Sequence, residues 1–333
     1  MAEEAPHIVI VGAGFGGQGV CHGLGQPEAS VTVIDPRDCI SVAASWHYQL
    51  ADRGAAAVVP LSITTAGKIG TLRANTVTQL DVNARSVTLD DGDVLTYSHL
   101  VLATGVLSDP STIPGLAECA TDITDFSCFA TLKQQIDSIA EGSSIHIAIS
   151  KCPYTCPPFP FELSFLIDES LRTRGVRDSC QILITSPVPW PFGGPGAEKV
   201  FKAAMQAKGI QYKGSCGVSA MQRNDDGKVL TSFSGDENAD VAADTVFATF
   251  PHRAPAFLAD QLNPKAFVPV NLQTNRVTKG LADDDNRVFC VGDACHAVMP
   301  AVGAPIPKVR PCSNCCSDLY GGCRLPHSVP HLY

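Results

Sequence analysis

The stretch that decides the fold is HIVIVGAGFGG, at residues 7–17. Its first part is an apolar, β-branched run, which predicts a buried strand. Gly12, Gly14 and Gly17 then follow in the spacing G-x-G-x-x-G. In such a turn the first glycine permits a sharp bend, the second lets the backbone approach a pyrophosphate, and the third lets the next helix pack against the strand. The free N–H groups at the start of that helix favour phosphate, so the stretch predicts a dinucleotide site.

The next predicted strand, Ser30–Ile34, supports this interpretation. It ends at Asp35, which lies 23 residues after Gly12. A carboxylate at this place in a dinucleotide-binding unit accepts hydrogen bonds from a ribose. Because the glycine pattern lies between a predicted strand and a predicted helix that runs to about Leu24, we interpret it as a cofactor-binding turn rather than a chance cluster of glycines.

Outside this region, apolar runs alternate with helical patterns, which predicts an α/β fold with largely parallel sheets. The expected strands are 100–103, 145–149, 181–185 and 288–291, and the expected helices are 129–140, 161–173 and 196–208. Residues 74–89 alternate like an antiparallel pair, and residues 216–247 predict a small meander around the turn at 225–227.

Two later motifs specify the dinucleotide. Ala103-Thr104-Gly105 closes a predicted strand and resembles the second nucleotide-contacting strand of the flavoprotein disulfide reductases. Gly292-Asp293 follows the last predicted strand and resembles the late Gly-Asp motif of the same proteins, whose aspartate accepts hydrogen bonds from the ribityl chain of FAD. Small residues at 103 and 105 let the backbone approach a cofactor closely. The resemblance therefore implies FAD, bound non-covalently, as the cofactor of the first domain.

On this basis we expect two Rossmann-like dinucleotide-binding domains. Residues 1–110 form the first part of an FAD-binding domain, 111–247 a middle NAD(P)-binding-like domain, 248–308 the return segment of the FAD-binding domain, and 309–333 an atypical cysteine-rich tail. The FAD-binding domain is thus expected to be discontinuous in the sequence.

The middle domain lacks the second glycine turn that NAD(P)H-using members of this superfamily carry. After the strand 145–149 the chain reads SKCPYTCPPFPFE, at residues 150–162. Proline has no N–H to donate, and its ring blocks a close approach. A loop with four prolines in this place disfavours a nicotinamide donor.

The same loop resembles the Cys-Pro-Pro-x-Pro-aromatic-Glu segment of the sulfide:quinone oxidoreductase and flavocytochrome c sulfide dehydrogenase family, with Cys156 and Glu162 at the matching positions. In that family the cysteine is half of a redox-active pair at the flavin, and the glutamate is proposed as an acid/base group. The resemblance therefore implies that Cys156 handles sulfur and that Glu162 moves a proton, which is chemistry suited to a thiol and a carboxylate. A structural role for Cys156 stays open. For Cys152, which has no family counterpart, a structural or adventitious role is the favoured interpretation.

The resemblance extends over roughly residues 6–308 and ends at Pro305-Ile306-Pro307-Lys308. After Lys308 the second catalytic cysteine and the amphipathic C-terminal helices of the quinone-reducing branch are not found, and we interpret the tail as a product of alternative splicing, alternative reading or an incomplete gene model. Its C-x2-C-C-x6-C spacing does not match a paired zinc knuckle, so no metal site is predicted. The cysteines and histidines in question are Cys312, Cys315, Cys316, Cys323, His327 and His331.

Other candidates are weaker. Trp46-His47-Tyr48 is expected mainly as a packed aromatic cluster, although related flavoproteins approach the isoalloxazine in this region. Cys39 lies near the place of the covalent FAD link in the flavocytochrome branch, but its spacing from Asp35 and its neighbours differ. His296 is expected to be structural.

Composition excludes several classes of function. The net charge is −9 and no basic stripe is visible, so a nucleic-acid partner is not expected. No apolar run reaches the length of a membrane span, and no signal peptide is visible, which makes the cytoplasm the default expectation. Most of the 14 cysteines are then expected to be free core residues. Peripheral membrane association is a property that the resemblance implies for the quinone-reducing branch.

Three hypotheses follow for function. The first is an FAD-dependent oxidoreductase that takes electrons from a small reduced-sulfur substrate through Cys156 and passes them to a quinone or a small electron carrier. The second is an NAD(P)H:acceptor oxidoreductase like the type II NADH dehydrogenases or the relatives of apoptosis-inducing factor, which the proline loop disfavours. The third is an inactive FAD-binding protein without its C-terminal segment.

Overall fold

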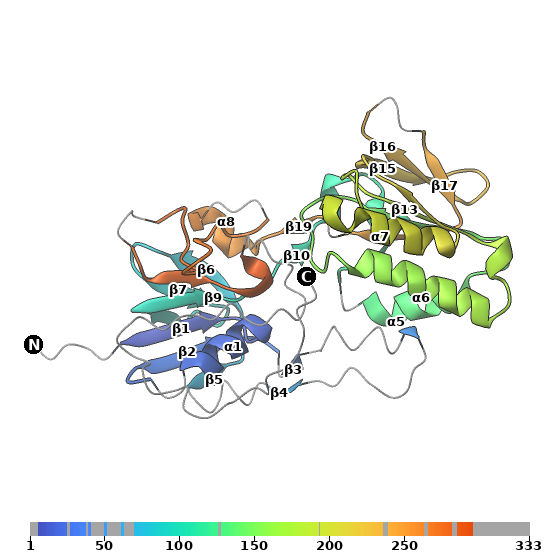
Figure 1. Cartoon of the computed structure of the whole chain (residues 1–333). Helices are drawn as coiled ribbons and strands as arrows, with labels where there is room; N and C mark the ends of the chain where they lie inside the picture. Colours follow the sequence, from blue (N-terminus) through green and yellow to red (C-terminus); the bar gives the residue numbers. More distant parts are fainter. Residues whose placement is uncertain are drawn as a thin grey trace, which may run out of the picture.

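The computed structural model describes residues 6–24, 27–37, 39–40, 50–51, 61–62, 70–125, 128–192, 194–235, 239–262, 266–281 and 285–295. Two five-stranded sheets form the centres of two units, which Figure 1 shows next to one another. The predicted α/β fold with two Rossmann-like units is confirmed. Among the described helices, none combines the length and the apolar character that a bilayer crossing requires.

The sheet of the first unit is entirely parallel and has the order β20-β9-β1-β2-β5. Its strands are β1 (His7–Val11), β2 (Ser30–Ile34), β5 (Thr71–Arg73), β9 (His99–Leu102) and β20 (Val288–Cys290). β20 reaches this sheet from a segment almost 200 residues after β9, since Val288 pairs with Leu100. The first unit is therefore built from two separate stretches of the chain, as the fold prediction required.

Each face of this sheet has a different cover. Helix α1 (Phe15–Leu24) packs through Val20 and Cys21 against Ile10 and Val33 on one face. The other face carries the antiparallel β6 (Val77–Asp81), β7 (Ser86–Leu89) and β8 (Val94–Thr96), together with helix α8 (Ala256–Leu262). Because successive strand residues point to opposite faces, alternate positions of β1 serve the two cores.

The middle unit repeats this arrangement. Its parallel sheet has the order β11-β18-β12-β13-β14, with β11 (Thr121–Asp122), β12 (Ser144–Ile149), β13 (Gln181–Thr185), β14 (Ile210–Lys213) and β18 (Thr245–Thr249). Helices α5 (Phe129–Ser138), α6 (Phe159–Thr173) and α7 (Gly194–Ala207) lie on one face. The other face carries α4 (Leu116–Cys119) and the meander β15 (Val218–Arg223), β16 (Val229–Phe233) and β17 (Val241–Ala243).

Two predicted boundaries in this unit are corrected. The meander predicted over 216–247 ends earlier, because Thr245–Thr249 is a parallel strand between β11 and β12. This segment is buried on both faces, and such strands show a continuous apolar run in place of alternation. Helix α6 begins at Phe159 instead of residue 161, since proline is tolerated in a first helical turn. The domain boundaries at residues 110, 247 and 308 stay predictions.

An ion cluster around the buried Asp168 stabilises the middle unit. Asp168 on α6 has no exposed surface and accepts hydrogen bonds from Arg177 at 2.7 Å, Lys208 at 2.9 Å and Arg172 at 3.0 Å. Burial alone would raise the pKa of Asp168, but these cationic donors outweigh it and hold the pKa below its ordinary value. The cluster ties α6 to the short helix η4 (Arg177–Ser179) and to the end of α7.

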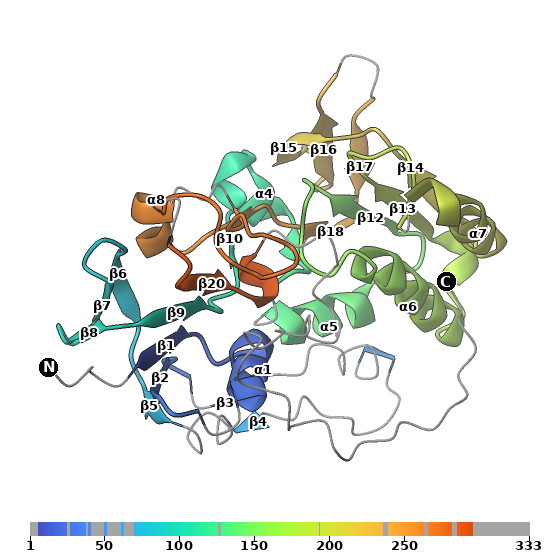
Figure 2. The same ribbon diagram turned by 60° about the vertical axis from the view of Figure 1, so that its left-hand side comes forward.

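A two-stranded crossing connects the units. Strand β10 (Leu107–Ser108) pairs antiparallel with β19 (His252–Arg253), and Figures 1 and 2 both place β10 between the two large sheets. The remaining short elements are β3 (Cys39–Ile40), β4 (Leu61–Ser62), and the 3-10 turns η2 (Pro110–Thr112) and η5 (Gly292–Ala294).

Candidate active site

The glycine turn after β1 is a place of very close backbone approach. Gly12 has φ +99°, and a Cβ there would lie 2.3 Å from the carbonyl oxygen of Ala103. A Cβ on Gly17 would lie 1.9 Å from the carbonyl oxygen of Gly12. A Cβ on Gly14, by contrast, would meet only Nη2 of Arg37, at 4.0 Å. The turn is thus closed toward β9 and open at Gly14, which is the arrangement that a pyrophosphate needs at a helix N-terminus.

Asp35 lies beside this turn. Its buried carboxylate accepts the N–H of Ala13 at 2.7 Å, and the side chain of Arg37 donates to both oxygens at 2.8 and 2.9 Å. Burial opposes ionisation, but these hydrogen bonds prevail and keep the pKa of Asp35 below its ordinary value. A ribose hydroxyl would therefore donate to a carboxylate that already accepts hydrogen bonds from Ala13 and Arg37. Arg37 also places a cation near Gly14.

The late Gly-Asp motif meets the start of α1. Gly292 has φ +69°, and a Cβ on Gly16 would lie 3.3 Å from the Gly292 backbone. The half-buried Asp293 carboxylate accepts no hydrogen bond from any residue that the structure describes, and burial raises its pKa to about 6. A partly buried carboxylate without a donor is costly unless a ligand supplies one. This position fits a hydroxyl of the ribityl chain.

The predicted cofactor residues therefore meet at one edge, where β1, β9 and β20 end. Ala103 donates its N–H to Val11 at 2.8 Å, and Gly105 follows with φ +67°. Thr104 donates its hydroxyl to the carbonyl of Gly105 at 3.1 Å, so its side chain stabilises the turn itself. Close backbone at Gly12 and Gly17, an open side at Gly14 and a free acceptor at Asp293 together fit FAD.

The loop between β12 and α6 holds the predicted sulfur chemistry. Cys156 is half-buried and has φ +52°, a conformation that is uncommon for a residue with a side chain and costs on the order of 1 kcal/mol. Its carbonyl accepts the N–H of Phe159 at 3.0 Å, while the hydroxyl of Tyr154 donates to the carbonyl of Pro157 at 3.0 Å. Backbone held in an unfavourable region often marks a functional position.

Electrostatics connects this loop to the cofactor residues. Burial, together with the negative charges of Glu162 and Asp293, raises the pKa of the Cys156 thiol to about 12. Both carboxylates therefore lie within electrostatic reach of the sulfur, although they come from different units. The structure thus brings the two predicted catalytic residues near a predicted FAD-binding residue, and it keeps Cys156 a neutral thiol at neutral pH.

Cys152, in the same loop, lies on the wall of a cavity of about 230 Å³. The other lining side chains are mainly aromatic or proline, among them Tyr154, Phe161, Trp190 and Phe192. The hydroxyl of Tyr212 fixes the far wall by donating to the carbonyls of Val188 at 3.0 Å and Trp190 at 2.7 Å. The cavity lies beyond the ends of β12 and β13, where a second dinucleotide would bind in a Rossmann-like unit.

A second signal at this cavity was missed in the sequence. After β13 the chain reads SPVPWPF, at residues 186–192. Ser186 and Pro187 stand where Asp35 stands in the first unit, so the middle unit has no ribose-binding carboxylate at this position. A comparison of this proline-rich segment with the end of β2 would have revealed the missing carboxylate from the sequence alone.

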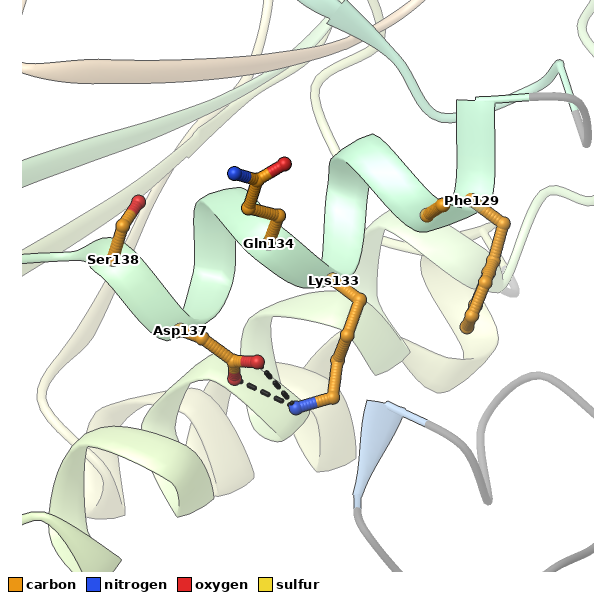
Figure 3. A pocket seen from close by; sticks show the side chains of 6 residues that line it. Phe129, Lys133, Gln134, Asp137 and Ser138 are labelled. Atoms are coloured by element: carbon orange, nitrogen blue, oxygen red, sulfur yellow. Dashed lines mark hydrogen bonds and ion pairs between the residues drawn. The ribbon is translucent and has the colours of Figure 1, made fainter.

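A larger hollow, of about 640 Å³, lies along α5, and Figure 3 shows the side chains that line it. Lys133 and Asp137 form an ion pair of 2.7 Å across it, and Phe129 lies at its end. The described lining comes from one helix and contains none of the predicted site residues. We therefore do not assign the chemistry to this hollow.

Several sequence candidates lie outside the described part of the chain: Trp46–Tyr48, His296, the segment 305–308 and the tail from residue 309, as well as the side chain of Cys39. Within the described part, no three His, Cys, Asp or Glu side chains gather as metal ligands would.

Comparison with protein families gives two matches, which overlap at residues 129–143. Residues 6–143 match the pyridine nucleotide-disulphide oxidoreductase family, and residues 129–243 match the central domain of the flavoprotein chain of sulfide dehydrogenase (flavocytochrome c). The second match contains the whole loop with Cys156 and Glu162.

Among curated proteins, the chain is similar to the demethylphylloquinone reductase NdbB of a Synechocystis strain, with 27% identity over 242 residues. This match covers 68% of the chain and 57% of that protein. Ferroptosis suppressor protein 1 of Mus musculus is 33% identical over 107 residues, which is 30% of the chain and 27% of that protein. The chain thus spans between about a quarter and three fifths of the length of these relatives.

Two solved structures show the same fold. The sulfide:quinone oxidoreductase from the hyperthermophilic bacterium Aquifex aeolicus has a TM-score of 0.76 and 18% identity, covering 87% of this chain and 69% of that one. NDH2 from Plasmodium falciparum in complex with NADH has a TM-score of 0.69 and 13% identity, covering 88% and 65%. Both the sulfide-oxidising and the NADH-binding neighbours therefore share the arrangement of the two units.

Proposed function

Because the chain belongs to the pyridine nucleotide-disulphide oxidoreductases and its cofactor is FAD, we propose that it oxidises sulfide or a related small thiol through Cys156. The residues that would hold FAD are Gly12, Gly14, Gly17, Asp35, Ala103, Thr104, Gly105, Gly292 and Asp293. When bound, FAD supplies a two-electron acceptor beside the thiol.

The proposed reaction balances with one cysteine. A Cys156 thiol and HS⁻ give a Cys156 persulfide, one proton and two electrons. The bond that forms joins Sγ of Cys156 to the substrate sulfur, and the S–H bond of Cys156 breaks. FAD, when bound, would accept the two electrons, and the proton passes to a base on the protein.

Glu162 is the proposed base. Because the pKa of Cys156 is raised to about 12, only on the order of one thiol in 10⁵ is ionised at neutral pH. A nearby carboxylate that accepts the proton as the sulfur reacts removes this limitation. Glu162 lies in the first turn of α6, six residues after Cys156, and its charge contributes to the raised pKa of the thiol.

One observation carries the proposal: the loop after β12, with Cys156 at φ +52° and Glu162 in the first turn of α6, lies within the match to the central domain of the flavoprotein chain of sulfide dehydrogenase (flavocytochrome c). The negative charge of Asp293, on the return segment, also contributes to the raised pKa of the Cys156 thiol, which supports a place for the thiol toward the cofactor-binding edge. The middle unit lacks a second glycine turn, which favours binding of a dinucleotide, and a carboxylate after β13, which would bind the ribose of NAD. Both absences support the same conclusion.

A quinone is the proposed final acceptor. The support comes from two similar proteins, a sulfide:quinone oxidoreductase and a demethylphylloquinone reductase. The similarity to NDH2, whose structure was solved in complex with NADH, favours an alternative in which a nicotinamide nucleotide donates the electrons. The proline loop and the Ser186-Pro187 pair argue against this alternative.

An anaerobic titration distinguishes the proposals. Purified FAD-loaded protein is mixed with sulfide and, separately, with NADH and NADPH, and the flavin absorbance near 450 nm is followed. We expect rapid bleaching by sulfide and none by the nucleotides. Bleaching by NADH alone would reject sulfide oxidation in favour of the alternative, and no bleaching by any donor would indicate an inactive FAD-binding protein.

The matched variants are Cys156→Ser and Cys152→Ser. The first should keep FAD but lose sulfide bleaching, and the second should keep both, since Cys152 faces the separate cavity. Unchanged bleaching in Cys156→Ser would remove this cysteine from the mechanism.

A further inference from the structure

His252 lies on β19, in the crossing between the two units. It pairs with Ser108 of β10, and the neighbouring Pro251 accepts the N–H of Asp109 at 2.6 Å. The imidazole leaves this crossing toward the loop between β12 and α6, where Nε2 accepts the backbone N–H of Thr155 at 2.9 Å. The hydroxyl of Thr155 lies 3.2 Å from the same nitrogen. His252 of β19 therefore binds Thr155, which directly precedes Cys156 in the chain.

This hydrogen bond defines the state of the ring. A backbone N–H can only donate, so Nε2 must be unprotonated, and the single ring proton of the neutral form lies on Nδ1. Nδ1 is buried and has no hydrogen-bond partner among the described residues. Protonation would turn Nε2 into a donor that faces another donor, and the contact with Thr155 would be lost.

The surroundings of the ring favour the neutral form. Burial lowers the pKa of His252, and the charge of Asp122 offsets this in part. Among the described residues, Asp122 is the charged group that shifts the pKa of the ring. Its carboxylate accepts hydrogen bonds from Ser108 at 2.6 Å and from Thr124 at 2.6 and 2.7 Å. Phe267 packs edge-on against the ring at 6.0 Å. His252 is thus held as an acceptor at neutral pH.

The loop has few backbone N–H groups with which it can be anchored, so an acceptor for the N–H of Thr155 matters. Pro153, Pro157, Pro158 and Pro160 have no N–H. The hydrogen bonds of Tyr154 and Phe159 stay within the loop. The Thr155 N–H, next to a cysteine at positive φ, instead links this strained stretch to a different element.

We propose that His252 is a positioning residue for Cys156: its neutral ring holds the Thr155 backbone so that the thiol stays near the cofactor-binding Gly-Asp segment, and acid releases it. The catalytic consequence rests on the proposed function of Cys156, whereas the restraint on the loop does not. The proposal therefore predicts an effect on the backbone that can be measured separately from turnover.

Two substitutions test it in the full-length FAD-loaded protein. Glutamine at 252 places an amide oxygen near the Nε2 position and does not titrate, while leucine removes the acceptor. Hydrogen exchange at the Thr155 amide, resolved by mass spectrometry or NMR and corrected for the intrinsic rate, is measured from about pH 7.5 to about pH 4.5. His22→Gln, at an exposed position on α1, is the matched control.

We expect His252→Leu to lower the protection of the Thr155 amide by about tenfold at pH 7.5, and His252→Gln to retain most of it. In the parent the protection should fall as acid charges the imidazole, whereas His252→Gln should show no such fall. Parent-like protection in His252→Leu, or the same acid-induced loss in His252→Gln, would overturn the proposal.

Sulfide bleaching is the second readout and keeps the two proposals apart. If His252→Leu slows bleaching at least about tenfold and glutamine restores it, positioning extends to the reaction. If the exchange result holds but sulfide bleaches neither parent nor variant, the function fails and the positioning role stands. If bleaching needs Cys156 and His252→Leu matches the parent in both readouts, the positioning role alone fails.

Discussion

Replacing Gly17 by alanine should force α1 away from β1 and weaken FAD binding. The new Cβ would lie 1.9 Å from the carbonyl oxygen of Gly12, and real Cβ atoms do not come closer than 3.0 Å, so the backbones must separate by about 1.1 Å. Neither partner is a flexible side-chain end. Overpacking of this kind costs about 1–3 kcal/mol, which corresponds to a fall in Tm of roughly 2–12 °C for a domain of this size.

The affinity for FAD should fall more clearly than the stability, because the same movement shifts the N–H groups at the start of α1, where the phosphates of FAD would bind. We expect the Kd for FAD, measured by fluorescence quenching of the free flavin, to rise at least about tenfold. Gly23→Ala is the matched control: it lies on the same helix, its Cβ would meet nothing within 4 Å, and helix propensity predicts a gain of about 0.5–1 kcal/mol. If Gly17→Ala melts and binds FAD like the parent, the close packing of the turn is incorrect.

Three further outcomes are expected. In the apoprotein at pH 8, Cys156 should react with iodoacetamide about 10³-fold more slowly than an ordinary thiol, since its pKa of about 12 stands three units above 9.0; fast labelling in peptide mass spectrometry would contradict this. The pKa of Asp293 is raised from 3.8 to about 6, so its charge weakens the apo fold as the pH rises through this range. Asp293→Asn should therefore unfold in urea at a free energy up to about 3 kcal/mol higher than the parent at pH 7.5 and equal to it near pH 3.5, and equal values at both pH values would argue against an unpaired carboxylate. Asp168→Asn should lose about 3–5 kcal/mol because it leaves the buried Arg177 without its anion, whereas Lys208→Met should cost at most about 1 kcal/mol; similar losses in the two variants would mean that the buried pair is not the stabilising part of the cluster.

The first unit was predictable because its signals are local. A glycine turn between a strand and a helix has few alternatives, since only residues without a Cβ fit where Gly17 crosses Gly12. These local signals predicted the α/β fold with two units and the FAD cofactor, and the structure and the comparisons confirm both. The catalytic roles of Cys156 and Glu162 and the cofactor contacts of the individual residues stay predictions.

The rest of the site could not be derived from local patterns, because it depends on contacts over long sequence separations. His252 follows Thr155 by 97 positions, and its sequence neighbours give no sign of the hydrogen bond between them. The end of the meander was misjudged for a similar reason. Thr245–Thr249 has the apolar run of a central strand, but only the partners on either side, β11 and β12, decide that it is parallel.

The two units show how one architecture carries two different kinds of segment at the ends of its strands. Both place a parallel sheet between helices and an antiparallel layer, so the carboxyl ends of their strands offer equivalent positions. In the first unit these positions hold close-packed glycines and Asp35, which suit phosphates and a ribose. In the middle unit they hold prolines, which exclude a phosphate cradle and stiffen the backbone around Cys156. Because the prolines leave this loop few backbone N–H groups, an acceptor on another element is needed to anchor it through the N–H of Thr155. The crossing at β19 is in position to do so, because it ends beside the loop and belongs to the connection with the cofactor-binding unit.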